Sequence, residues 1–95
     1  MNSADFNLTA DPTTLFASDL ADNKKVFTVI VSNETDTEKS FTLEWGSQVI
    51  KSGTVASQGA VSLFDNVYFV HEAGEHLFAT GEGLTLHMVY GNHDG

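Results

Sequence analysis

The stretch 25–45, KVFTVIVSNETDTEKSFTLEW, decides the fold class, because two strand-like runs flank a polar tip. In the run 25–33 both alternating sets of side chains are largely apolar, which predicts a central strand. One set is Phe27, Val29 and Val31, and the other is Val26, Thr28 and Ile30. In the run 39–45 one set, Phe41, Leu43 and Trp45, is apolar, which predicts a strand with one buried face. The tip 34–38, ETDTE, is polar and predicts a hairpin loop.

Turn signals divide the rest of the chain into further short, strand-like runs. These runs lie at 13–17, 49–55, 60–64, 67–71, 76–80 and 84–90. The spacing predicts an all-β fold of about eight short antiparallel strands, arranged as a β-sandwich or a jelly-roll-like barrel. Residues 13–90 form this domain. The polar residues 1–12 are expected to form an N-terminal arm that becomes ordered on a partner, and 91–95 a C-terminal tail.

The composition restricts the possible functions of this domain. The chain has 95 residues, thirteen Asp and Glu, four Lys, no Arg and no Cys, and its formal net charge is −9. An acidic surface repels the phosphate backbone, so we expect no nucleic-acid partner. No apolar run approaches the roughly 18 residues of a membrane helix, so we expect no membrane partner. Without cysteine there is neither a disulfide nor a thiolate metal site, and a partner chain is the expected source of additional stability.

The segment 71–76, HEAGEH, is similar to the zinc-protease motif H-E-x-x-H but has the wrong spacing. The second His follows the first by five residues, and Gly74 disfavours a helix. As a β-turn, the segment places His71 and His76 where they could face one another and hold an adventitious metal with Glu72 or Glu75. A polar turn is the preferred interpretation. We expect no metal, no cofactor and no catalytic residue, and therefore no enzyme.

The apolar side chains of the last strands exceed what one core between two sheets requires. If 72–75 is a hairpin loop, a second set points away from the core, and a one-residue change in the loop exchanges the faces of the following strand. This set, Tyr68, Val70, Leu77 and Val89, is the candidate subunit interface. A carbohydrate-binding module is the alternative from another class, with Trp45, Tyr68 and Tyr90 as its possible sugar platform.

Two segments carry a resemblance to a known group of proteins. Residues 13–45, TTLFASDLADNKKVFTVIVSNETDTEKSFTLEW, resemble the opening of small β-sandwich virion proteins of tailed bacteriophages. Residues 67–80, VYFVHEAGEHLFAT, are similar to a later segment with an E-A-G-D-like turn. The chain departs from the pattern at 20–23, LADN, where Pro-Ala-Gly is usual, and at His71, where an aliphatic residue is usual.

The resemblance implies a structural role in the virion. Such proteins are head decoration (cement) proteins or accessory proteins of the neck or tail. We therefore expect a capsid decoration protein that is made in the host cytoplasm, binds the major capsid protein or other virion proteins, and stabilises the head shell. A neck or tail component is the alternative within this class. A homo-oligomer, with a trimer favoured, would use the surplus apolar face.

Overall fold

The computed structural model describes residues 2–16, 23–46, 48–64, 69–72 and 74–92. In these residues the chain forms nine strands and no helix, which confirms the predicted all-β fold. The strands are β1 (Asn2–Asn7), β2 (Thr13–Phe16), β3 (Lys24–Asn33), β4 (Lys39–Trp45), β5 (Gln48–Val55), β6 (Ala60–Leu63), β7 (Phe69–His71), β8 (Leu77–Thr80) and β9 (Leu84–Asn92). No helix of this described part is long and apolar enough to cross a membrane.

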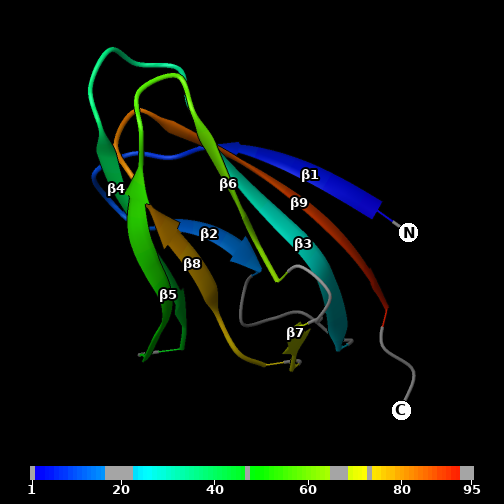
Figure 1. Ribbon diagram of the computed structural model, residues 1–95. Coiled ribbons are helices and arrows are strands. Elements are labelled where there is room, and N and C mark those ends of the chain that lie inside the picture. Colours follow the sequence, from blue (N-terminus) through cyan, green and yellow to red (C-terminus); the bar gives the residue numbers. More distant parts are fainter. Residues whose placement is uncertain (1, 17–22, 47, 65–68, 73, 93–95) are drawn as a thin grey trace.

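The strands form two antiparallel sheets that pack face to face as a β-sandwich (Figure 1). Sheet A has the order β1-β9-β3-β6, and β7 also pairs with β3. Sheet B has the order β2-β8-β4-β5. Because β3 and β4 belong to different sheets, residues 34–38 carry the chain from one layer to the other. The prediction of a hairpin loop at this tip is therefore wrong.

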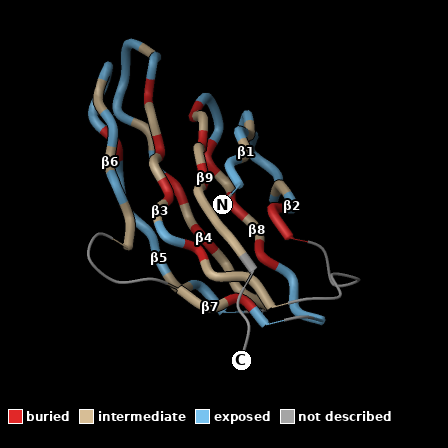
Figure 2. Tube along the Cα trace, turned by 90° about the vertical axis from the view of Figure 1, so that its right-hand side faces the viewer, coloured by how far each residue is buried: buried red, intermediate tan, exposed pale blue. Residues whose placement is uncertain are grey.

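The core lies between the two sheets, and its side chains come from the alternate positions of their strands (Figure 2). Sheet A contributes Val26, Val29, Val31, Leu84, Leu86 and Met88, and sheet B contributes Leu15, Phe16, Phe41, Leu43, Val55, Leu77 and Ala79. Leu8, just after β1, is also buried. The apolar set predicted for β4 faces this core: Phe41 and Leu43 are buried and Trp45 packs against them.

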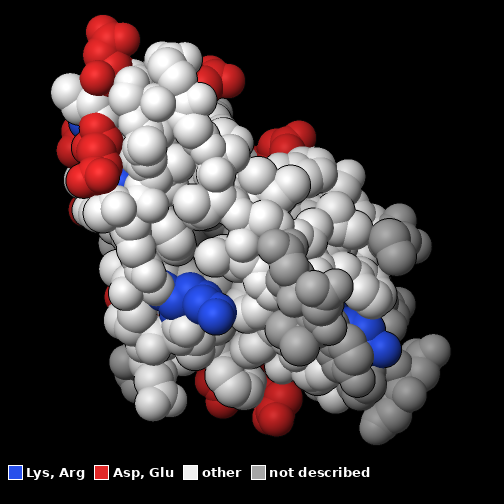
Figure 3. Space-filling model, viewed as in Figure 1, with Lys and Arg blue, Asp and Glu red and all other residues white. Residues whose placement is uncertain are grey.

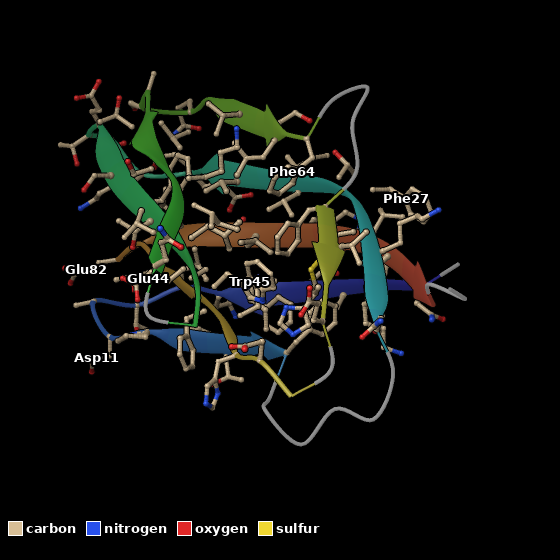
Figure 4. All side chains as sticks on the ribbon, turned by 90° about the horizontal axis from the view of Figure 1, so that it is seen from below. Asp11, Phe27, Glu44, Trp45, Phe64 and Glu82 are labelled. Carbon is tan, nitrogen blue, oxygen red and sulfur yellow. The ribbon has the colours of Figure 1, made fainter. Side chains whose placement is uncertain are left out.

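A β-bulge in β3 changes which of its residues face the core. The register with β9 shifts between Val26 and Thr28, so Phe27 is the additional residue. Val26 is therefore buried together with Val29 and Val31, whereas Phe27 is 36% exposed. Figure 4 shows Phe27 at the outer margin of β3, away from Trp45 and Phe64. The expectation that Phe27 shares a face with Val29 is wrong, because strict alternation does not continue through a bulge.

The N-terminal residues form an edge strand where a polar arm was expected. β1 pairs with β9 from Asn2 opposite Tyr90 to Asn7 opposite Thr85. Phe6 packs against the core and Leu8 is buried within it, so this segment is held by apolar contacts as well as by the ladder. At the other end, β9 continues to Asn92, which is two residues into the expected tail. Residues 93–95 of that tail lie outside the described residues.

Candidate functional site

The four residues predicted as a subunit interface do not share one surface. Leu77 has no exposed surface and lies on β8 opposite Phe16 and Trp45, so its assignment to the interface is wrong. The error has a topological cause: β7 and β8 belong to different sheets, and their turn joins the layers instead of closing a hairpin. Tyr68 lies outside the described residues. Val70 and Val89 remain, and both occupy outward positions of sheet A.

Val70 and Val89 belong to a continuous surface that we call the outer face of sheet A. It consists of the side chains of β1, β9, β3, β6 and β7 that point away from the core. These residues are Ser3, Asp5, Asn7, Lys25, Thr28, Ile30, Ser32, Ala60, Ser62, Val70, Thr85, His87 and Val89. No described strand or loop is layered over them (Figure 1). The face is therefore available for contact with a partner.

Aliphatic and hydroxyl side chains fill the centre of this face. Ile30 lies opposite both His87 and Ser62, and Thr28 lies opposite Val89, so Ile30 and Val89 are diagonal neighbours across two strands. The hydroxyl oxygens of Thr28 and Ser62 are 3.3 Å apart and share a hydrogen bond. Both aliphatic side chains are half-buried by their neighbours in the sheet. The side chains of the centre are thus in contact with their neighbours across the strands.

Among the described residues, no acidic side chain lies at this centre. The outward positions of β3, β6, β7 and β9 that the structure describes carry no Asp or Glu. Asp5 lies on the edge strand β1, where its Oδ1 is hydrogen-bonded to Nδ1 of His87. One group of acids lies at the end that holds the β3–β4 and β8–β9 loops, and further acids lie at the opposite end, as Figure 3 shows. The acids of the first group are Glu34, Asp36, Glu38 and Glu82.

A shallow depression lies at the upper margin of the outer face of sheet A. Its volume is about 260 Å³, and its polar lining comes from three strands. The polar residues of this lining are Asp5, Asn7, Ser32, Thr85 and His87. The Asp5–His87 pair joins residues 82 positions apart in the chain, and no local motif in the sequence indicates it. The pair orders the imidazole at the border between the edge strand and the aliphatic centre.

The two histidines of the 71–76 segment do not face each other. His71 is fully buried, and its Nε2 lies 2.8 Å from the carbonyl oxygen of Glu75. His76 is exposed and stacks on Phe78, with ring centroids 5.1 Å apart. Within the described residues there is no group of three side chains suited to hold a metal ion. The arrangement is a turn held by a buried imidazole.

Burial lowers the pKa of His71 below its ordinary value of 6.5. The loss of hydration is the largest cause, and it exceeds the opposing effects of the hydrogen bond to the Glu75 carbonyl and of the Glu75 and Glu72 charges. The neutral ring donates Nε2–H to that carbonyl, which leaves Nδ1 as an acceptor without a protein partner. The folded protein therefore favours the uncharged imidazole.

Two of the aromatic residues considered as a sugar platform, Trp45 and Tyr90, are partly buried and pack against the core. Trp45 packs edge-on against Phe69 at 5.3 Å, and Tyr90 packs edge-on against Phe16 at 5.2 Å. Figure 4 shows Trp45 in the interior between the two layers. The third residue, Tyr68, lies outside the described residues. The described rings thus form an aromatic cluster at the β7 end of the sandwich: Phe16, Trp45, Phe64, Phe69, His71 and Tyr90.

Comparison of the chain with protein-family models, with curated proteins and with solved structures finds no match.

Proposed function

We propose that this chain is a capsid decoration protein of a tailed phage, and that it binds the head shell through the outer face of sheet A. The observation that carries the proposal is the aliphatic centre of that face, around Ile30 and Val89, in a chain whose net charge is −9. These two aliphatic side chains lie among hydroxyl-bearing neighbours with no carboxylate between them, so a partner can cover this centre without desolvating an unpaired acid. The remaining support is the resemblance of residues 13–45 and 67–80 to small virion proteins.

The charge distribution fits this mode of binding. Bringing many acidic chains close together on one shell costs electrostatic free energy, which falls as the charges move apart. The acids at the loop end belong to the β3–β4 and β8–β9 loops and not to the outward strand positions of the docking face, so they stay in solvent when the face is covered. Each bound copy then adds buried area to the shell, and the sum over many copies shifts the shell towards its intact state.

A neck or tail accessory protein would use the same face on a different partner. The two roles differ in copy number: a decoration protein is present in proportion to the capsid subunits, whereas a neck or tail component is present in few copies. Quantitative mass spectrometry of purified particles distinguishes them. We favour the shell, because the segments that resemble virion proteins span much of the chain and the docking face carries few charges.

The test compares one substitution on each outer face of the sandwich. Val89→Asp places a charge in the centre of the outer face of sheet A. Thr42→Asp places the same charge at an equally half-buried outward position of β4 in sheet B. The binding of each variant to shells assembled from the major capsid protein of the same phage is measured by co-sedimentation.

We expect Val89→Asp to weaken binding by at least about tenfold, because an unpaired carboxylate is desolvated in the contact. Thr42→Asp should leave the affinity within about twofold of wild type. Thermal unfolding of both variants confirms that they fold. Equal affinities for the two folded variants, or a larger loss for Thr42→Asp, contradict the proposed docking face. No binding of the wild-type protein to any shell contradicts the proposed function.

A further inference from the structure

We propose that the free edge of β1 pairs with the β1 strand of a second copy of this chain, so that the two A sheets join into one sheet around a two-fold axis. Self-association of this kind does not depend on a role in a virion. β1 differs from the other edge strands of the sandwich in features that permit it.

The other strands at sheet edges have features that oppose pairing with another chain. β2 has four residues and a register shift between Thr14 and Phe16. β5 pairs irregularly with β4 at Glu44 and carries Lys51 at an inward position opposite Leu43. β6 and β7 have four and three residues. Shortness, bulges and inward charges are the usual means by which proteins protect a sheet edge.

β1 has none of these features. It pairs with β9 over six residues without a register shift, and it contains no proline. Asp5 is its single charged residue. Among the described strands, none pairs with the other side of β1. An edge of this kind presents a row of main-chain donors and acceptors to an added strand.

The ladder between β1 and β9 shows which main-chain groups face that open edge. The amide of Leu8 donates to the carbonyl of Leu84, 2.8 Å away, so residues 8 and 84 are a hydrogen-bonded pair. Hydrogen-bonded pairs alternate along an antiparallel ladder, which directs the main-chain groups of Ala4 and Phe6 towards β9. The N–H and C=O groups of Ser3, Asp5 and Asn7 therefore point away from β9.

The sequence of β1 is compatible with its own antiparallel copy. A two-fold axis at Ala4 makes Ala4 of each chain a non-hydrogen-bonded pair, in which the Cα atoms approach to about 4.5 Å and small side chains fit. Ser3 then lies opposite Asp5 of the second copy, and its hydroxyl can donate to that carboxylate. An axis at Asp5 would place two carboxylates directly opposite each other, which is unfavourable.

The axis runs perpendicular to the sheet, so the inward side chains of both copies stay on the same side. Phe6, which packs against the core in each copy, then lies close to the joint on the apolar side. A symmetric contact of this kind closes at two copies. It differs in this respect from the trimer expected from the sequence.

Proline at position 3 tests the pairing without disturbing the ladder. Ser3 is exposed and its N–H points to the open edge, so Ser3→Pro removes a donor that β9 does not use. Ser3→Ala keeps the donor and is the matched control. The mass of each protein is measured by light scattering over a dilution series. We expect a dimer for wild type and Ser3→Ala, and a dissociation constant at least about tenfold higher for Ser3→Pro, because two interchain hydrogen bonds are lost.

Charges at the same position test the register and retain the N–H group. Ser3→Lys places an ammonium opposite Asp5 of the second copy and should tighten the dimer, whereas Ser3→Asp should weaken it by a similar factor. Thr54→Lys, at an exposed outward position of β5, gives the same change in net charge far from the joint. It should alter the dissociation constant less than Ser3→Lys does.

Three results overturn the inference: a monomeric wild-type protein at every concentration, a trimer, or a dimer that Ser3→Pro and Ser3→Asp leave unchanged. A wild-type monomer whose binding to shells is nevertheless lost in Ser3→Pro would assign the edge of β1 to a strand of the shell protein instead.

Discussion

Two fully buried polar side chains lie at opposite ends of the sandwich, and they differ in how many hydrogen bonds they make. At the loop end, Asn33 donates to the carbonyls of Thr37 and Val55 at 2.8 and 2.9 Å, and its Oδ1 accepts from the amide and the hydroxyl of Thr35. At the β7 end, His71 makes one hydrogen bond and leaves Nδ1 without a protein partner.

The difference lies in what each group holds together. The amide of Asn33 links the β3–β4 loop to β5 of the other sheet by a hydrogen bond, and this bond stabilises the crossing of the chain between the two layers. His71 fills space among aromatic rings, with Phe16 at 4.9 Å, and fixes only the Glu75 turn. The indole N–H of the neighbouring Trp45 is also buried without a partner. The loop end is therefore specified by hydrogen bonds and the β7 end by packing.

Among substitutions of the two buried polar residues, the largest effect should come from Asn33→Ala. The substitution removes the side-chain donor to the carbonyl of Val55, one of two donors to the carbonyl of Thr37, and the acceptor for the amide of Thr35, and an unmet buried group costs about 1–3 kcal/mol. We expect the free energy of unfolding to fall by about 3 kcal/mol or more, measured by urea denaturation. Thr37→Ala is the control, because its carbonyl remains, and its effect should stay within about 0.5 kcal/mol. If Asn33→Ala lowered the free energy of unfolding by less than about 1 kcal/mol, the loop end could not be said to depend on these hydrogen bonds more than the β7 end does.

A pH-dependent effect should come from His71. Because the folded state lowers the pKa of His71, the unfolded chain binds the proton more readily. The stability that this group contributes is fully present above pH 6.5 and declines as the pH falls below that value towards the lower pKa of the folded state. Wild-type protein should therefore lose free energy of unfolding between about pH 7 and pH 5.

In His71→Phe this part of the decline should be absent, since no proton is taken up at that position. His76→Phe is the matched control, because His76 is exposed and its removal leaves the decline in place. Urea denaturation at a series of pH values compares the slopes. An unchanged slope in His71→Phe would show that the buried imidazole does not control the acid sensitivity of this end.

The smallest effect should come from Trp45→Phe. It removes a buried N–H that has no partner in the protein and keeps an aromatic ring opposite Phe69. The smaller ring loses some buried area, so the free energy of unfolding should stay within about 1 kcal/mol of wild type. Trp45→Ala, which removes the ring, should cost about 3–5 kcal/mol in thermal or urea unfolding. A large loss in Trp45→Phe would reveal a hydrogen bond of the indole to an ordered water.

Alternation of side chains was sufficient to predict the fold class. It identified β3 and β4 as strands and assigned Phe41 and Leu43 correctly to the core. It could not show the bulge at Phe27, because an added residue leaves no local mark in an apolar run. β1 was missed because NSADFN is mostly polar, and its partners on β9 are 78 to 88 positions away in the chain.

The candidate site was predicted only in part, and the cause is topological. Strands that follow one another were assumed to pair, whereas the chain crosses between sheets from β3 to β4, from β5 to β6, from β7 to β8 and from β8 to β9. Because β7 and β8 belong to different sheets, Leu77 on β8 faces the core, whereas Val70 on β7 faces outward. Val89 was assigned to an outward position, and Ile30 and Thr28 join it there because they follow the bulge.

The most direct test of the proposed docking face is site-specific photo-cross-linking to assembled shells. A photoreactive phenylalanine analogue is placed at position 89, in the outer face of sheet A, or at position 42, in the outer face of sheet B. We predict a covalent adduct with the major capsid protein from position 89 and none from position 42. An adduct from position 42 alone, or none from either position in protein that is bound to the shell, would contradict the assignment of the outer face of sheet A as the docking surface.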